Sequence, residues 1–189
     1  MSLILKGLTR FYPWLTLTLV YLALGMVGRL VLWARFGIEA DVGISQLPYV
    51  AAAGSVNDAV ESLYLFAPFA VYTLLLPDHW FRSRVNRVLL STAFTLTVAG
   101  LIYLTATEYF FFEEFDARLN IVAYDYLAFP TEVFTDIWDA YPVLKVLGIA
   151  ITLAAATLLL LRNRIQPGFD HVVKFPDRLA TFVPYCIAL

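Results

Sequence analysis

The sequence predicts an all-α membrane protein with four full transmembrane helices, the start of a fifth, and an amphipathic juxtamembrane helix on the extracytoplasmic side. The chain has 189 residues, of which 61% are hydrophobic and 15% are charged. Its mean hydropathy is +0.76. The apolar residues form runs of about 20, the length that crosses roughly 30 Å of hydrocarbon as a helix. One soluble core cannot bury this composition, so a soluble domain is excluded.

Net charge and cysteine content exclude further classes of protein. The formal net charge is only -2, so no basic surface for nucleic acid is expected, and membrane lipids are the expected partners. The single cysteine, Cys186, provides neither a disulfide framework nor a Cys/His metal cluster. We therefore predict no metal and no cofactor within this chain.

The first expected span, residues 13–36, carries two arginines toward its far end. The run is longer than the apolar part of a signal peptide and has no cleavage site, so it is interpreted as a retained anchor. Arg35 can snorkel to the interface, whereas Arg29 lies deeper and needs a polar environment. Helix-end snorkelling and a ligand-facing role both remain open for Arg29. We expect it to pair with Asp58 or Glu61 near the outer interface.

The second expected span, residues 59–77, contains Pro68 and follows a predicted loop at residues 37–57. Proline removes a backbone donor and clashes with the preceding turn, so a kink is predicted in this helix. A short basic loop then leads into the third span, residues 88–108.

The fourth expected span, residues 143–162, is the most uniformly apolar segment of the chain. A polar linker separates it from residues 179–189, which form the start of a fifth helix too short to cross a bilayer. We therefore expect the chain to be part of a longer protein, with a catalytic domain following residue 189.

The distribution of charge predicts the orientation in the membrane. Alternating spans place nearly all basic residues on one side, which the positive-inside rule makes cytoplasmic. These residues are Lys6, Arg10, Arg82, Arg84, Arg87, Arg162, Arg164, Lys174 and Arg178. The N-terminus is then cytoplasmic, and the acidic residues 108–142 are extracytoplasmic.

Residues 109–142 are too charged to span a membrane and too aromatic for an ordinary loop. Apolar side chains recur at helical spacing in the second half, which predicts an amphipathic helix at the outer interface. These are Val133, Phe134, Ile137, Trp138 and Tyr141. The segment is interpreted either as a collar that seats the helices or as a polar cleft that touches a lipid headgroup or an appended domain. Its carboxylates match no defined metal loop and have no nucleophile beside them.

Two stretches carry a family pattern. Residues Glu114–Pro142, EFDARLNIVAYDYLAFPTEVFTDIWDAYP, are similar to a pattern of EF-x-x-RFN, then DYL, then EV and a terminal YP. Residues Gly54–Pro77, GSVNDAVESLYLFAPFAVYTLLLP, are similar to G-x-x-x-D followed by a proline-kinked apolar helix. Both resemble the membrane part of the lipoteichoic acid synthase and phosphoglycerol transferase family, within the alkaline phosphatase and sulfatase superfamily.

The resemblance implies five helices in the bacterial cytoplasmic (inner) membrane, followed by a large extracytoplasmic catalytic domain. There, a threonine nucleophile and a divalent metal (Mn or Mg) would transfer phosphoglycerol or a related headgroup from a lipid donor. No such threonine site lies in this chain, so no catalytic residue is carried over. The matching positions would seat that domain or guide the donor lipid. They are Glu114, Asp116, Arg118, Asn120, Asp125, Tyr126, Glu132 and Tyr141.

Three functions follow as hypotheses. The first is the membrane anchor and lipid-proximal domain of an extracytoplasmic phosphoglycerol or phosphoethanolamine-type transferase. The second is a membrane scaffold or assembly subunit that recruits partners through its aromatic collar. The third is a small transporter subunit, for which Arg29, Glu61 and Lys145 would be the polar residues of the pathway.

Overall fold

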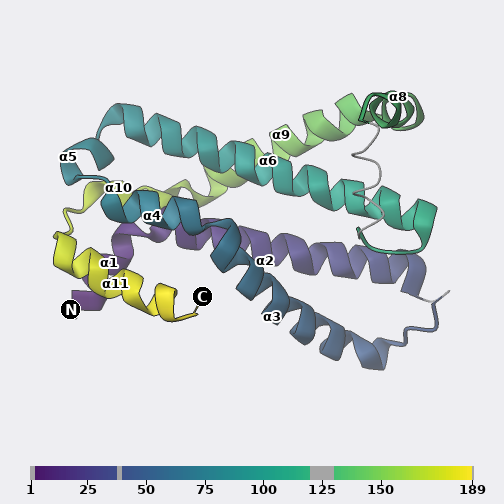
Figure 1. The fold of residues 1–189 in the computed structure, drawn as a ribbon, viewed down its shortest axis with the longest axis horizontal. Coiled ribbons are helices and arrows are strands. Elements are labelled where there is room, and N and C mark those ends of the chain that lie inside the picture. Colours follow the sequence, from purple (N-terminus) through teal and green to yellow (C-terminus); the bar gives the residue numbers. More distant parts are fainter. Residues whose placement is uncertain (1–2, 38–39, 120–129, 189) are drawn as a thin grey trace.

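The computed structural model describes residues 3–37, 40–119 and 130–188, and every regular element in these residues is helical (Figure 1). Three helices are long and apolar enough to cross a membrane, and a bent pair makes up to four if it is one span. The three are α2 (Tyr12–Leu32) with the π turn η1 (Trp33–Gly37), α6 (Arg84–Phe115) and α9 (Val143–Ile165). The bent pair is α3 (Leu47–Leu65) and α4 (Ala67–Leu75).

The shorter helices lie at the two ends of this bundle. One end, called the α1 end, gathers α1 (Leu3–Arg10), α5 (Asp78–Phe81), α10 (Pro167–Asp170) and α11 (Phe175–Ala188) (Figure 1). The opposite end, called the α8 end, carries α8 (Pro130–Ala140), and a short 3-10 turn, η2 (Ile44–Gln46), precedes α3.

Helix α2 is central, because it packs against α6 and α9 and also against α3. The buried core at these contacts contains Leu17 of α2, Phe94 and Val98 of α6, and Ala154 of α9. The small side chains of Ala150 and Ala154 are fully buried, so α9 approaches its neighbours closely. Much of the remaining apolar surface faces outward, as expected for helices surrounded by lipid.

The predicted proline kink is confirmed. Helices α3 and α4 meet at Phe66 with a bend of 47°, and Pro68 lies in the first turn of α4. The predicted loop at residues 37–57 is largely wrong, because helix α3 begins at Leu47. Proline at the first turn suits a helix start, and the run Ala51–Ala53 favours helix.

Helix α6 is longer than the predicted span of residues 88–108. Its first turn is capped by Ser83, whose Oγ accepts a hydrogen bond from the backbone N–H of Asn86 at 3.1 Å. It ends at Phe115, and the next residue, Asp116, adopts the left-handed conformation with φ 50° that commonly closes a helix. Residues 109–115, predicted to lie in the juxtamembrane segment, therefore continue the third span as helix.

The cap gives a first prediction. Ser83→Ala should lower the free energy of unfolding by about 1 kcal/mol, because one backbone donor at the start of α6 loses its acceptor. Thermal unfolding of the detergent-solubilised protein measures this loss. Ser91→Ala, inside the same helix, is the control, and equal losses in the two variants would show that the cap is not the cause.

A buried ion cluster joins α1, α5 and α11 at the α1 end. Asp78 Oδ1 accepts from Arg10 Nη1 and from Arg178 Nη2, at 2.6 Å each. Arg10 Nε donates to the carbonyl oxygen of Thr73 at 2.8 Å, and both arginines donate to the carbonyl oxygen of Leu76. Helix α11 begins at Phe175, earlier than the predicted residue 179, so Arg178 lies inside it.

Both arginines of this cluster are almost completely buried, with exposed side-chain fractions of 0% for Arg10 and 6% for Arg178. Desolvation lowers the pKa of Arg10 to about 10, Arg178 acts in the same direction, and Asp78 opposes both. The group still carries its charge at neutral pH. The cluster is therefore two buried cations that depend on one carboxylate.

Candidate functional site

Most of the candidate residues that the structure describes fall into two places. The first is a polar cluster between α2 and α3, which contains Arg29, Asp58 and Glu61. The second is a cleft between the end of α6 and α8, which we call the α6–α8 cleft.

Arg29 forms a buried ion pair with Asp58. The Nη2 and Oδ1 atoms lie 2.5 Å apart, and the side chains are only 9% and 10% exposed. Arg29 is about 12 Å of helix away from Gly37, the last residue of its span, so the pair lies below the end of the bundle. Of the two partners predicted for Arg29, the structure selects Asp58.

Two glycines make room for this pair. A Cβ atom at Gly54 would lie 2.1 Å from Arg29 Nε, and one at Gly25 would lie 2.2 Å from Asp58 Oδ2. Gly54 precedes Asp58 by four residues, about one helical turn, so both face the same guanidinium. The spacing Gly54-x-x-x-Asp58, noted in the sequence, therefore leaves room for the Arg29 side chain and supplies its carboxylate partner.

Glu61 lies one turn beyond Asp58 and has different partners. It accepts a hydrogen bond from the hydroxyl of Tyr21 at 2.8 Å and another from Asn57 Nδ2 at 2.7 Å. Arg29 Nη1 and Asp58 Oδ2 are buried and have no hydrogen-bond partner among the residues that the structure describes. A charged pair buried in this way holds one helix against another only while both members remain, since either alone would be a buried unpaired charge.

Arg118 extends the charged residues toward the α8 end. Its Nε donates to Glu108 Oε1 at 2.5 Å. This hydrogen bond raises the pKa of Arg118 despite partial desolvation, and the charges of Asp58 and Glu61 act in the same direction. Arg118 therefore lies within electrostatic range of the cluster on α3.

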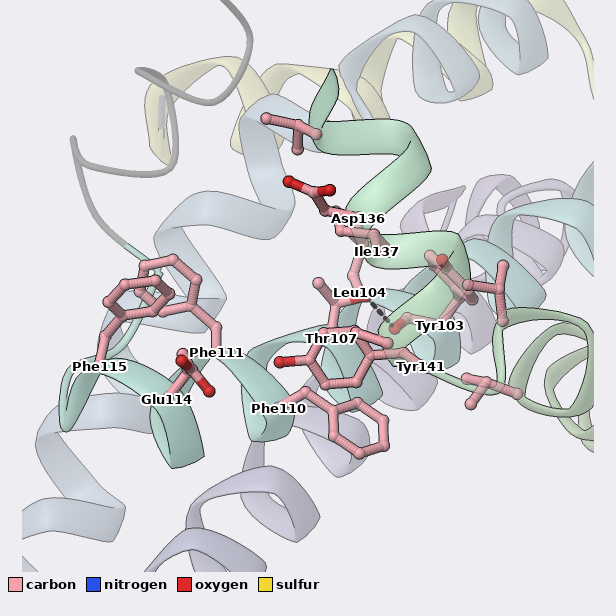
Figure 2. A pocket seen from close by; sticks show the side chains of 14 residues that line it. Tyr103, Leu104, Thr107, Phe110, Phe111, Glu114, Phe115, Asp136, Ile137 and Tyr141 are labelled. Carbon is pink, nitrogen blue, oxygen red and sulfur yellow. Dashed lines mark hydrogen bonds between the residues drawn. The ribbon is translucent and has the colours of Figure 1, made fainter. Parts of the chain in front are cut away.

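The α6–α8 cleft encloses a cavity of about 590 Å³ (Figure 2). The last turns of α6, the inner side of α8 and the start of α9 form its walls. The lining residues are Tyr103, Leu104, Thr107, Phe110, Phe111, Glu114, Phe115, Val133, Asp136, Ile137, Ala140, Tyr141, Val143 and Val146.

Aromatic contacts shape the cleft. The rings of Phe110 and Tyr141 lie 5.1 Å apart and those of Phe111 and Phe115 lie 4.6 Å apart. Glu114 and Asp136 are the two carboxylates of the lining, and they project from α6 and α8 on opposite sides of the cavity (Figure 2). The site is therefore an apolar cavity with negative charge at its edges.

The predicted amphipathic helix is present as α8 (Pro130–Ala140). Of the residues predicted to contact a lipid headgroup or an appended domain, Glu114 and Tyr141 line the cavity, whereas Asp116 forms the C-cap of α6. Glu132 belongs to α8, although its side chain is outside the described part. The predictions for Asn120, Asp125 and Tyr126 fall outside the described residues.

The sequence did not predict that Asp136 lines the cavity or that Gly25 makes room for the ion pair of Arg29 and Asp58. The helical spacing offered a signal for Asp136, because it lies one turn from Ala140 and three residues from Val133, both of which also line the cavity. Gly25 gave no signal, since its role depends on where α3 packs.

No protein-family model, no curated protein and no solved structure matches this chain. Among the described residues, no group of three His, Cys, Asp or Glu side chains is placed to hold a metal ion.

Proposed function

We propose that the chain is the membrane anchor and lipid-proximal domain of an extracytoplasmic phosphoglycerol or phosphoethanolamine-type transferase. In this proposal the bent pair α3 and α4 is one span and α11 begins a fifth. The α8 end is extracytoplasmic and carries the catalytic domain. The basic residues of the α1 end, such as Arg82, Arg84 and Arg162, favour a cytoplasmic position for that end.

One observation carries the proposal: the positions that match the family pattern have defined contacts in the structure. Gly54 and Asp58 of the second stretch both contact Arg29. Glu114 and Tyr141, near the two ends of the first stretch, line one cavity. Residues far apart in the pattern are thus brought together, which supports a common role for the segment beyond that of a connecting loop.

The cavity also supports a lipid-proximal role. It lies at the ends of two candidate spans, α6 and α9, where lipid chains and headgroups meet. A transferase held beside this region meets its lipid donor in two dimensions and at a high effective concentration. Anchoring would then contribute to the rate of transfer without any catalytic group in this chain.

The proposal is tested on the polypeptide as the cell makes it. The protein is purified from its natural gene with a tag and its intact mass is measured. It is then reconstituted with Mn²⁺ and vesicles that contain phosphatidylglycerol and phosphatidylethanolamine. We expect a mass well above 21.3 kDa and release of diacylglycerol from one of the two lipids. A polypeptide of 21.3 kDa that releases no diacylglycerol would overturn the transferase and favour the scaffold.

A further inference from the structure

We propose that the α6–α8 cleft binds an acyl chain of a phospholipid whose headgroup carries a primary ammonium, and that Glu114 and Asp136 receive this ammonium. The inference deepens the proposed function, because it names the headgroup charge of the lipid held at this site. It rests on that function only for the role of the lipid as a donor.

The walls of the cleft suit a hydrocarbon chain. The volume of about 590 Å³ falls within the range of about 300 to 1,000 Å³ that is typical of small-ligand sites. Leu104, Phe110 and Phe111 of α6 and Ile137 of α8 all line the cavity (Figure 2). An acyl chain enters the cleft from lipid or detergent hydrocarbon, so its binding there depends on van der Waals packing against these walls and not on removal of apolar surface from water.

The two carboxylates at the edge of the cleft should favour a headgroup that carries a positive charge. Glu114 and Asp136 are both exposed and stand on opposite walls, so a headgroup above the chain lies between two carboxylates. The described lining contains no lysine or arginine. Arg118 pairs with Glu108, and Lys145 lines a separate groove on α9 with Gly148.

This arrangement discriminates between common headgroups. A net anionic headgroup such as phosphatidylglycerol brings its phosphate toward two like charges and offers no cation in return. The ammonium of phosphatidylethanolamine carries a positive charge and three N–H donors, so it can donate charge-assisted hydrogen bonds to these carboxylates. A quaternary ammonium has the same charge without any N–H donor, so it separates charge attraction from hydrogen bonding.

The test measures bound lipid on the detergent-solubilised chain by native mass spectrometry, in equal mixtures of phosphatidylethanolamine and phosphatidylglycerol. We expect phosphatidylethanolamine to bind about tenfold more tightly, which corresponds to about 1.4 kcal/mol. Glu114→Gln with Asp136→Asn should abolish this preference. Glu113→Gln with Asp139→Asn is the matched control, because it removes the same charge from exposed positions beside the cavity lining. It should keep the preference.

A second variant tests the chain-binding part. Ala140→Trp places an indole in the cavity and should reduce binding of both lipids several-fold. The inference is overturned if the two lipids bind equally, if the control pair loses the preference as well, or if Ala140→Trp has no effect. Phosphatidylcholine that binds as tightly as phosphatidylethanolamine would overturn the role of the N–H donors.

The outcome is separable from that of the proposed function, because no catalysis is measured. A full-length protein that transfers headgroups while this chain binds both lipids equally would leave the proposed function standing and remove the inference. A chain that prefers phosphatidylethanolamine in a protein without transferase activity would retain the binding site and remove its role as a donor site.

Discussion

Asp78→Ala should lower the free energy of unfolding by about 3 to 5 kcal/mol, the largest effect expected of a single substitution in this chain. Asp78 is the shared partner of Arg10 and Arg178, and both guanidinium groups are buried. Without the carboxylate they face one another as like charges, stabilised by backbone carbonyl groups such as that of Leu76 and, for Arg10, by the ring of Phe81 at 3.9 Å. Helices α1 and α11 should separate from the rest of the bundle.

Thermal unfolding in detergent measures this loss, and proteolysis after Arg178 reports separation of α11. The matched control is Asp170→Ala at the same end of the bundle. Asp170 pairs with Arg87 at 2.9 Å, but both side chains are substantially exposed, so its loss should cost less than about 1 kcal/mol. Equal destabilisation by the two variants would show that the buried cluster contributes no more than an exposed ion pair.

The apolar runs were sufficient to predict the helices, because a long run of Leu, Val and Ala can satisfy its backbone only as a helix in lipid. The start of α3 was not predicted. Gly54, Asn57 and Asp58 have the composition of a loop. Inside the helix, Gly54 and Asp58 contact Arg29 of another helix, and Asn57 donates a hydrogen bond to Glu61. Asp58, which makes this segment resemble a loop in the sequence, is also the residue that pairs with Arg29 and holds α3 against α2.

The candidate site was predicted in part for a similar reason. Aromatic and acidic residues identified the segment that contains Glu114 and Tyr141. Whether they share a cavity depends on which side of α8 packs against α6. Sequence periodicity predicts which residues share one face of a helix, but it does not predict which helix that face contacts. Asp136 can therefore be assigned to the cavity only from the structure, which places α8 against α6.

Gly54→Ala should destabilise the protein by about 2 kcal/mol, although alanine is favoured over glycine in a helix by about 1 kcal/mol. The added Cβ would lie 2.1 Å from Nε and 2.4 Å from Cζ of Arg29. The guanidinium must move, although Asp58 holds its Nη2 atom and Gly25 lies close to its Nη1 atom. Displacement weakens a buried ion pair whose two charges depend on each other.

Gly100→Ala is the matched control, because it makes the same change inside the long helix α6 at a position where a Cβ meets nothing within 4 Å. It should stabilise the protein by up to about 1 kcal/mol, so the two substitutions are expected to differ in sign. Thermal unfolding of both variants in the same detergent makes the comparison. Two stabilising results would show that Arg29 accommodates the methyl group without loss of its pairing with Asp58.

A variant that lacks the ion pair tests whether displacement of the Arg29 guanidinium causes the destabilisation by Gly54→Ala. In Arg29→Leu with Asp58→Leu, both charges are removed together, so neither is left unpaired. If the cost of Gly54→Ala arises from displacement of the guanidinium, it should fall by at least half in this background, as measured by a double-mutant cycle. An unchanged cost would assign the effect to the backbone of α3. Because Gly54, Asp58 and Arg29 act as one unit in this argument, the cycle tests the physical meaning of the G-x-x-x-D spacing itself.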